Sequence, residues 1–343
     1  MMSTLYNTII HLYIIIIYIA SVYNQKAKKW INGRRNIFPK LKNEIQYTKD
    51  IVWFHCASLG EFEQGKTIIE KYKLKYPKHK LLLTFFSPSG FEFQKNCKIV
   101  DWVFYLPADT KKNAEKFIEI VNPIKVIFVK YEFWYNYINT LYKKNIPILF
   151  VSTIFRKNQL FFKNKWIANQ LKKISHFYLQ DKKSQDLLSN IEIQNSTICG
   201  DSRFDNIIKN SSNKKEFPLI KIFCKTRPTI IFGSIWPKDF TIINQFIKAH
   251  NNYNYIIAPH ELTYVNYLQK KTNSQLYSEI QQNNINLKNI IIIDNIGMLS
   301  TVYKYGKISY IGGGFNNGIH NILEPIIFGK PVIFGPKHQK FTE

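Results

Sequence analysis

From residue 51 onward, short apolar runs alternate with longer segments whose apolar residues recur at helical spacing. Runs such as IVWFHCA, LLLTFFS and IPILFVSTIF are nearly continuous, which is typical of strands buried on both faces of a parallel sheet. The segment after the first run, SLGEFEQGKTIIEKYKLKY, is typical of a loop that leads into an amphipathic helix. Strands that alternate with helices in this way predict a parallel sheet with helices on both sides, and therefore an α/β fold.

The alternation occurs twice, with a break between the two series. The segment 206–227, NIIKNSSNKKEFPLIKIFCKTR, is polar and basic and contains Pro218. We therefore predict a Rossmann-like domain over residues 36–206, a linker over 207–227 and a second Rossmann-like domain over 228–343. A chain of 343 residues has room for two domains of roughly 150 residues each. Because ligands of doubly wound sheets bind beyond the carboxyl ends of the strands, we expect the two domains to face a cleft.

The N-terminal segment has a different pattern. Residues 5–23, LYNTIIHLYIIIIYIASVY, form the most apolar run and are about long enough to cross a bilayer, which takes roughly 20 residues. The Lys- and Arg-rich segment QKAKKWINGRR follows, and such flanks stay on the cytoplasmic side, while tryptophan suits the membrane interface. We predict that residues 1–35 form a membrane anchor and its basic flank, either spanning the bilayer or lying in its inner leaflet. A buried helix of the first domain is the alternative.

The charge balance favours anionic partners. The chain carries 48 Lys and Arg against 23 Asp and Glu, a formal net charge of +25, which suits nucleic acid, an anionic membrane surface or phosphorylated substrates. The basic residues are spread along the chain and match no reader motif, so we predict no nucleic-acid binding. The four cysteines form no CxxC pair, which indicates neither a zinc site nor a disulfide framework and fits a reducing cytosol.

Charged residues follow three strands of the first half. Glu61 lies at the start of a helix, where the dipole keeps its carboxylate ionised, and is a candidate general base; a helix cap is the alternative. Lys130 and Glu132 lie among aromatic residues at another strand end. They could bind a sugar or a phosphate, and a solvated turn is the alternative. Arg203 in GDSRFD is placed to neutralise a phosphate, or to form a surface pair with a neighbouring aspartate.

The glycine-rich stretch YIGGGFNNGIHNILEPIIFGKPVIFGP dominates the second half. Glycines including Gly313 and Gly314 let the backbone turn sharply and leave room for a ligand. We predict a helix that begins near His320, supported by Pro325, whose first-turn N–H groups favour a phosphate. Glu324 is placed to accept hydrogen bonds from a ribose diol. Phosphate and ribose together predict a nucleotide site, and a glycine-rich turn with no ligand is the alternative.

Two more strand ends carry candidate contacts. Ser234 closes one strand, and Pro259 and His260 close the next. His260 is placed to contact a phosphate or a base, although a lone histidine also serves structural roles. The sequence contains no P-loop, HExxH, GxSxG or complete GxGxxG motif, so the chemistries of those motifs are not indicated.

Taken in order, these motifs resemble the 3-deoxy-D-manno-octulosonic acid (Kdo) transferases of lipopolysaccharide and lipid A synthesis. The resemblance rests on FHCASLGEF, FFSPSG, YLPAD, KYEFWYN, GDSRFD, GSIWP, APHE, DNIGML and GGGFNNGIHNILEPIIFGKPVIFGP. It implies a GT-B glycosyltransferase fold, with the lipid acceptor on the N-terminal domain and CMP-Kdo on the C-terminal one. It also implies inversion at the anomeric carbon of the sugar, no cofactor, and no metal bound by the protein.

The resemblance assigns roles to individual residues. Glu61 resembles the base that deprotonates the acceptor hydroxyl, and Arg203 falls where the family usually has a lysine that stabilises the transition state. Lys130 and Glu132 complete the expected catalytic set. The expected substrate contacts, which lie on the family's CMP-contacting motifs or beside them, are Ser234, Pro259, His260, Gly297, Met298, Leu299, Gly313, Gly314, His320, Asn321, Ile322, Leu323 and Glu324.

The chain departs from the family pattern at a few positions. Lys130 stands where many members have a glutamate, although Glu132 is kept two residues later. His260 replaces an arginine, and Met298 replaces a glutamate, which leaves only backbone to contact the nucleotide there. Family members also continue through more of the second domain and a helix that crosses back to the first, so we expect the C-terminal domain to be incomplete.

The resulting hypothesis is a Kdo transferase anchored on the cytoplasmic face of the inner membrane. It would transfer Kdo from CMP-Kdo to the lipid A precursor lipid IVA, next to an anionic membrane surface. Two alternatives remain open: another GT-B glycosyltransferase that uses a UDP-sugar, and a non-catalytic, basic, membrane-associated binding protein.

Overall fold

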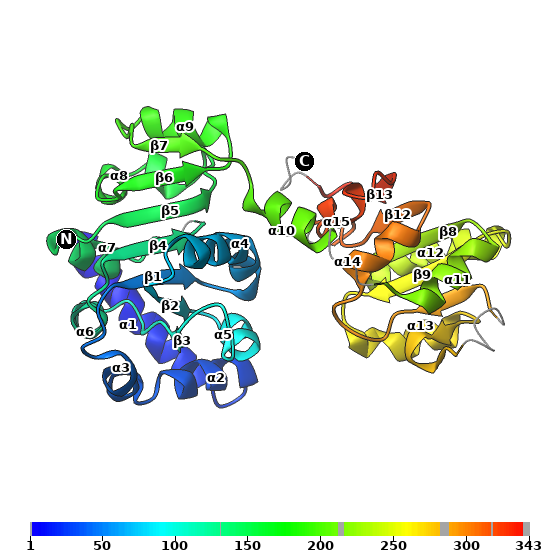
Figure 1. Ribbon diagram of the computed structural model, residues 1–343, viewed down its shortest axis with the longest axis horizontal. Coiled ribbons are helices and arrows are strands. Elements are labelled where there is room, and N and C mark those ends of the chain that lie inside the picture. The colour runs from blue at the N-terminus through cyan, green and yellow to red at the C-terminus, as the bar shows by residue number, and fades with distance from the viewer. Residues whose placement is uncertain (1, 131, 212–215, 282–287, 317, 339–343) are drawn as a thin grey trace. The chain divides into compact units, whose positions relative to one another are not determined.

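The computed structural model of the protein describes residues 2–130, 132–211, 216–281, 288–316 and 318–338. The chain divides into two compact units, Met1–Asn206 and Ile207–Glu343, which we call the first and the second unit (Figure 1). Each unit has its own parallel sheet, with a hydrophobic core on either face of that sheet.

The described residues of the first unit form a seven-stranded sheet in the order β3-β2-β1-β4-β5-β6-β7, and each neighbouring pair is parallel. β1 lies between β2 and β4, so the strand order reverses there, and this is where doubly wound sheets bind their ligands. The strands are β1 (Ile51–Cys56), β2 (Lys80–Phe85), β3 (Trp102–Tyr105), β4 (Lys125–Val129), β5 (Ile148–Thr153), β6 (His176–Leu179) and β7 (Ser196–Ile198).

Helices cover both faces of this sheet because its strands are apolar on both sides. Within β1, Trp53 belongs to the core on one face and Phe54 to the core on the other, as the two-residue period of a strand requires. The helices are α2 (Gln25–Arg34), α3 (Ile37–Ile45), α4 (Leu59–Lys75), α5 (Pro88–Gln94), α6 (Lys111–Val121), α7 (Tyr135–Lys143), α8 (Lys165–Leu171) and α9 (Lys182–Ser189), with a 3₁₀ turn η1 (Leu160–Phe162) before α8.

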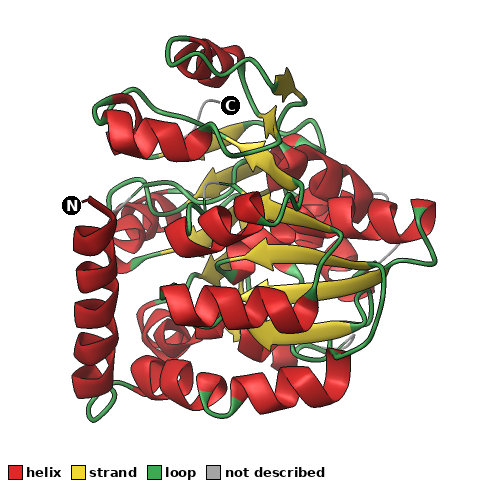
Figure 2. Ribbon diagram, turned by 90° about the vertical axis from the view of Figure 1, so that its left-hand side faces the viewer, coloured by secondary structure: helices red, strands yellow, loops and turns green. Residues whose placement is uncertain are grey.

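The apolar N-terminal run forms one helix, α1 (Met2–Ala20), and none of its residues, all of which are described, is buried. It is the one helix in the described residues that is long and apolar enough to cross a membrane. It lies along the edge of the first unit (Figure 2), where Tyr6 Oη donates a 2.6 Å hydrogen bond to Asp109 Oδ2. Asn136 Nδ2 donates to Asn7 Oδ1 at 2.9 Å. The helix is therefore docked on the unit by polar contacts and by ring contacts of Tyr6 and Tyr13, while other apolar side chains, such as Ile16, stay exposed.

The described residues of the second unit form a six-stranded parallel sheet in the order β10-β11-β9-β8-β12-β13. Its strands are β8 (Thr229–Ile235), β9 (Asn254–Pro259), β10 (Gln275–Leu276), β11 (Ile290–Ile292), β12 (Ile308–Ile311) and β13 (Val332–Phe334). Its helices are α12 (Pro237–Ala249), α13 (Val265–Lys271), α14 (Leu299–Val302) and α15 (Leu323–Ile326), with 3₁₀ turns η2 (Leu262–Tyr264), η3 (Tyr277–Glu279) and η4 (Tyr303–Tyr305).

The segment 207–227, expected as a linker, is largely helical where it is described. It contains the end of α10 (Ser202–Ser211) and the whole of α11 (Pro218–Thr226). Ile220 and Phe223 of α11 are buried in a core of the second unit, because these apolar residues recur at helical spacing behind a favourable N-terminal proline. The predicted α/β class, with two parallel doubly wound sheets, is confirmed.

Candidate functional site

In the first unit, the residues predicted as catalytic gather at the carboxyl edge of the sheet. β1 and β4 are parallel neighbours, so the segments that follow them emerge side by side. Glu61 lies in the first turn of α4, where its Oε2 accepts a hydrogen bond from Ser58 N at 3.0 Å. Glu132 follows β4, and its carboxyl group is hydrogen-bonded to that of Glu61.

The two carboxyl groups share a proton. Burial and the neighbouring Glu61 carboxylate raise the pKa of Glu132 far above its ordinary value. Burial also raises the pKa of Glu61, but the positive charge of Lys130 and the N–H groups of Ala57 and Ser58 oppose that rise. Two coupled acids of this kind hold one proton between them, which we place on Glu132 because its environment opposes ionisation more strongly. Glu61 is then the group that stays ionised and can accept a proton.

Lys130 provides the positive charge next to this pair. It adopts a left-handed backbone conformation, with φ of 69°, which is uncommon for a non-glycine residue. The turn is held because Lys130 N donates to Val151 O at 2.9 Å and Thr153 Oγ1 donates to Lys130 O at 2.8 Å. Burial lowers the pKa of Lys130, and the Glu61 carboxylate opposes that change. Strained residues of this type occur often at functional sites.

Arg203 is held in place by its neighbour Asp201. Arg203 Nε donates to Asp201 Oδ2 at 2.6 Å, and the backbone N–H of Arg203 donates to Asp201 Oδ1 at 2.9 Å. This is the local Arg–Asp pair that the sequence left open. The charge of Arg203 also contributes to lowering the pKa of Lys130, so the guanidinium belongs to the same cluster. The structure therefore brings Glu61, Lys130, Glu132 and Arg203 together within one unit.

The sequence did not single out His55, which fixes the loop that carries Glu132. His55 is fully buried, and burial lowers its pKa to about 3, so the ring is neutral. Trp134 Nε1 donates to His55 Nε2 at 3.2 Å, which places the ring proton on Nδ1, 2.8 Å from Thr84 Oγ1. Trp134 is two residues after Glu132, so this chain of hydrogen bonds orients the loop. The available signal was a histidine inside the apolar run IVWFHCA.

In the second unit, the glycine-rich turn is fixed by another residue that the sequence did not single out, Asp239. Its carboxylate is fully buried and accepts three hydrogen bonds: from Trp236 N at 3.0 Å, from Gly313 N at 2.9 Å and from Tyr310 Oη at 2.9 Å. Asp239 therefore joins the start of α12 to the turn after β12. The available signal was an acidic residue in the first turn of a helix that begins with Pro237.

The glycines of this turn make room for backbone rather than for a ligand. A Cβ on Gly312 would lie 2.2 Å from Ser234 O, and one on Gly314 would lie 2.6 Å from Gly335 Cα. Gly313 has φ of +94°, as the sharp turn requires. The expected open space for a ligand beside these glycines is therefore filled by the ends of β8 and β13.

The helix expected near His320 begins later and is short. α15 covers only Leu323–Ile326, and Leu323 N donates to Asn321 Oδ1 at 3.1 Å. Pro325 explains the later start: proline is tolerated in a first turn, and a start at His320 would have placed it in a helix interior. A single turn has few aligned peptide dipoles, so the predicted phosphate site at its N-terminus has little support from the dipole.

Glu324 is a buried titratable group beside the glycine-rich turn. Burial raises its pKa to about 7, and the hydrogen bond that Asn321 Nδ2 donates to Glu324 Oε1 at 3.4 Å opposes the rise. The carboxyl group therefore changes charge near neutral pH, and its ionised form is an acceptor for hydroxyl groups.

Three rings stack beside the glycine-rich turn. The His260 ring lies 4.6 Å from that of Trp236 and 4.2 Å from that of His320, centroid to centroid. Trp236 Nε1 donates to His320 Nε2 at 2.8 Å, so that nitrogen carries no proton. Burial and the neighbouring His260 lower the pKa of His320 to about 4. His260 and His320, separate in the sequence, thus belong to one stack of rings.

The other predicted contacts lie at the same edge of the second sheet. Ser234 has φ of 54° near the end of β8, Pro259 ends β9, and Gly297 has φ of +94° before α14. Three of the predicted contacts are apolar and buried, and so have only backbone to offer a ligand: Met298, Ile322 and Leu323. Leu299 begins α14.

Among the described residues, no group of three or more His, Cys, Asp or Glu side chains is placed to hold a metal ion. That the protein needs neither a metal nor a cofactor remains a prediction.

The sequence matches known proteins over most of its length. It is 30% identical over 342 residues to a bifunctional glycosyltransferase/methyltransferase of Fusobacterium nucleatum. That alignment covers 93% of this chain and 52% of the relative. It is 28% identical over 318 residues to the 3-deoxy-D-manno-octulosonic acid transferase of Aquifex aeolicus, covering 90% of this chain and 82% of the relative. The chain thus spans about half the length of the first relative and more of the second.

Solved structures show the same fold at low sequence identity. A glycosyltransferase from Rickettsia africae superposes with a TM-score of 0.54 at 15% identity, covering 87% of this chain and 83% of that one. The UDP-GlcNAc 2-epimerase of Neisseria meningitidis gives a TM-score of 0.54 at 14% identity, covering 82% of this chain and 81% of that one. The two Rossmann-like units therefore have the GT-B fold.

The family model described as 3-deoxy-D-manno-octulosonic-acid transferase (kdotransferase) matches residues 30–206, just over half of the chain and nearly all of the unit that holds Glu61, Lys130, Glu132 and Arg203. This protein therefore belongs to the Kdo transferase family of glycosyltransferases.

Proposed function

We propose that this protein transfers Kdo from CMP-Kdo to lipid IVA, with inversion at the anomeric carbon and with Glu61 as the general base. The observation that carries the proposal is the proton-sharing pair of Glu61 and Glu132, which lies in the unit that the family model matches. An ionised carboxylate beside a protonated one is suited to take a proton from a hydroxyl group.

In the proposed reaction, the oxygen of an acceptor hydroxyl attacks the anomeric carbon of Kdo. The bond between that carbon and the phosphate oxygen of CMP breaks, and its electron pair leaves with CMP. The hydroxyl proton passes to Glu61. Burial brings the pKa of Glu61 closer to the working pH, which is the condition under which a general base is effective.

The cations of the first unit support the charge changes of this reaction. Lys130 stabilises the Glu61 carboxylate before the proton is transferred. Arg203, whose orientation Asp201 fixes, supplies positive charge for the departing phosphate. Fixed charges of this kind need no reorganisation at the moment of reaction.

For the donor, we propose that the nucleotide uses the edge of the second unit that carries Asn321 and Glu324. The Glu324 carboxylate accepts hydrogen bonds from the ribose hydroxyls when it is ionised. Asp239 keeps the glycine-rich turn in the position that this contact needs.

For the location, we propose the cytoplasmic face of the inner membrane. α1 presents exposed apolar residues along its length, among them Leu12, Ile16 and Ile19, each more than half exposed. The basic segment after α1 adds attraction to anionic lipid.

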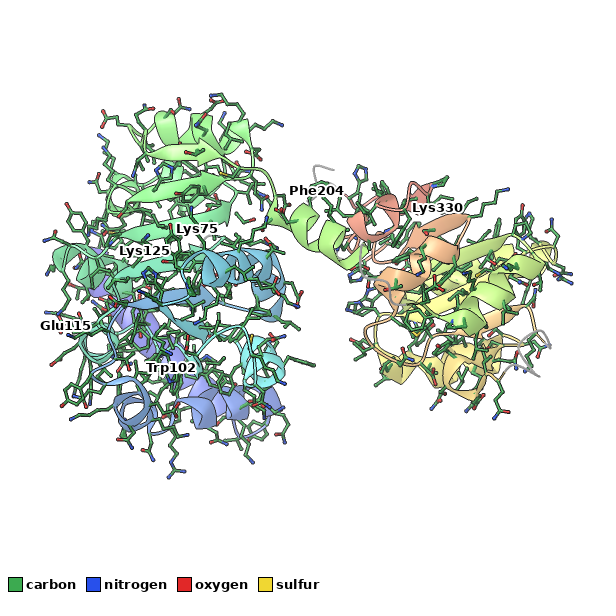
Figure 3. All side chains as sticks on the ribbon, viewed as in Figure 1. Lys75, Trp102, Glu115, Lys125, Phe204 and Lys330 are labelled. Carbon is green, nitrogen blue, oxygen red and sulfur yellow. The ribbon has the colours of Figure 1, made fainter. Side chains whose placement is uncertain are left out.

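The test is Kdo transfer by the purified protein, with CMP-Kdo and lipid IVA in mixed micelles. We expect Glu61→Gln to lower the rate by roughly 10²- to 10⁴-fold, as for loss of a general base. Glu115→Gln is the matched control, because Glu115 is an exposed glutamate of the same unit (Figure 3). The assay is run on this chain and on one extended with the C-terminal residues of the Aquifex relative.

Three results would overturn the proposal. Turnover with UDP-sugars and none with CMP-Kdo would assign a different donor. Full activity of Glu61→Gln would remove the base from the mechanism. Lipid binding without any transfer by either version of the chain would make this a binding protein.

A further inference from the structure

A pocket of about 350 Å³ separates part of α1 from the body of the first unit. Its volume lies within the roughly 300–1,000 Å³ that is usual for ligand pockets. Its walls come from α1, the loop after β4, α7, η1 and α8. We call it the α1 groove, and its lining residues are Met2, Leu5, Tyr6, Ile9, Phe133, Tyr135, Ile138, Leu160, Phe161, Trp166, Ile167, Gln170 and Leu171.

The α1 groove is apolar, and its rim is open to the surroundings. Leu5, Ile9 and Leu160 are 52%, 53% and 65% exposed, so large apolar side chains stand at the surface where the groove begins. The wall that α1 forms is fixed, because Tyr6 is hydrogen-bonded to Asp109 and its ring packs on Tyr135 at 5.3 Å. Apolar surface of this kind binds an apolar partner better than it binds water.

One wall of the groove comes from the loop that carries Glu132. Phe133 lines it and is held by stacking on Phe150 at 4.7 Å and by contact with Phe161 at 4.5 Å. Phe133 is the residue after Glu132, whose carboxyl group is hydrogen-bonded to Glu61. The groove is therefore connected to the carboxylate pair through one loop, in which Phe133 lines the groove and Glu132 contacts Glu61.

A cation stands at the rim of the groove. Lys173 Nζ donates to Gln170 Oε1 at 2.6 Å and lies 5.7 Å from the centre of the Tyr135 ring, and both of these residues line the groove. Its other hydrogen bond goes to Asn139 Oδ1 at 2.8 Å. Within the described residues no carboxylate pairs with Lys173. An apolar groove with an ammonium group at its rim matches a molecule that has an alkyl chain and an anionic head.

We infer that the α1 groove holds an acyl chain of the lipid acceptor, so that α1 is a wall of the acceptor site as well as a membrane anchor. The inference rests on the proposed function, because that function supplies an acylated, anionic acceptor. The shared loop, with Phe133 in the groove and Glu132 hydrogen-bonded to Glu61, favours the acceptor over a bilayer lipid, because a bilayer lipid takes no part in the reaction.

The first test compares acceptors with and without acyl chains. Leu5→Ser/Leu160→Ser removes apolar contact at the rim, and both leucines are exposed enough for the fold to tolerate the change. Since each buried methylene is worth roughly fourfold in affinity, we expect the KM for lipid IVA to rise roughly tenfold or more with kcat unchanged. The kinetics with a deacylated bisphosphorylated disaccharide should not change. Leu74→Ser, at a leucine that is 83% exposed on α4, is the control and should behave as the wild type.

The second test needs no turnover, so the inference can fail separately from the proposed function. Trp166 lines the groove, and lipid IVA with brominated acyl chains should quench its fluorescence. Trp166→Phe should remove most of the bromine-dependent quenching, whereas Trp102→Phe, on β3 (Figure 3), should keep it. An unchanged KM in the double variant, or quenching that does not depend on Trp166, would overturn the inference. Quenching by brominated phosphatidylglycerol that lipid IVA does not displace would assign the groove to a bilayer lipid and would also overturn it.

Discussion

Replacing Asp239 with alanine should destabilise the second unit strongly. The carboxylate is fully buried and accepts hydrogen bonds from Trp236 N, Gly313 N and Tyr310 Oη. Each hydrogen bond to a charged acceptor is worth about 1.5–3 kcal/mol, and a buried donor left unpaired costs about 1–3 kcal/mol. Water can reach the partly buried donors of Trp236 and Tyr310, but the Gly313 N–H is buried. We therefore expect a loss of about 3–5 kcal/mol, against a total stability of about 5–15 kcal/mol for a typical domain.

The assay follows the second unit alone. Trp236 is the only tryptophan after residue 206, so its resonance in ¹⁹F NMR of the 5-fluorotryptophan-labelled protein reports on that unit during urea unfolding. With a slope of about 2 kcal/mol per molar urea, the expected loss shifts the midpoint down by roughly 2 M. Asp239→Asn keeps one oxygen acceptor and should lose less.

The control is Asp294→Ala. Asp294 also accepts a backbone hydrogen bond, from Ser278 N at 3.1 Å, but in an exposed position. We expect its midpoint to change by less than about 0.5 M, because water replaces an exposed partner. If Asp239→Ala and Asp294→Ala unfold the second unit at the same urea concentration, Asp239 does not hold the turn as we describe.

Three further predictions follow from the titrating groups and the glycine-rich turn. Because the pKa of Glu132 is raised from 4.5 to about 8, the wild type should lose stability as the pH rises through that window. In Glu132→Gln, the urea midpoint should depend less steeply on pH. An equally steep pH dependence in the variant would contradict the shared proton. CMP affinity, measured by calorimetry, should increase between pH 6 and 8 as Glu324 ionises, and Glu324→Gln should remove that increase. A wild-type CMP affinity that does not change with pH would exclude the ribose contact. Gly312→Ala should lower the melting temperature, because the new Cβ would lie 2.2 Å from Ser234 O. Gly60→Ala should not lower it, because the nearest atom to the new Cβ is 4.0 Å away. Equal melting temperatures of the two variants would refute the packing argument.

The sequence pattern predicted the α/β class and the position of Glu61 and Glu132 at strand ends, because both depend on local periodicity. It did not predict that these two carboxyl groups share a proton. That requires β1 and β4 to be neighbours in the sheet, although β2 and β3 lie between them in the chain. Strand order of this kind depends on long-range packing rather than on local propensity.

The same limit explains the parts of the second unit that were missed. Asp239 accepts a hydrogen bond from Gly313, which is 74 positions away, and no local pattern links an acid at a helix start to a turn that distant. The helix expected at His320 begins later for a local reason: Pro325 fits the first turn of a helix but not its interior, so the helix begins at Leu323. The sequence of α11 resembles a linker because its lysines and Pro218 obscure a short apolar face.

The docking of α1 has a consequence for the order of events during synthesis. Its partners in the first unit are far along the chain: Asn136 is 129 positions beyond Asn7, and Asp109 is 103 positions beyond Tyr6. At about 5–20 residues per second, the ribosome needs roughly 6–26 s to make the surface on which the helix docks. During that interval α1 is an apolar helix without its docking surface, which is long enough for it to enter a lipid surface. The first unit would then complete its fold against a helix that is already at the lipid surface.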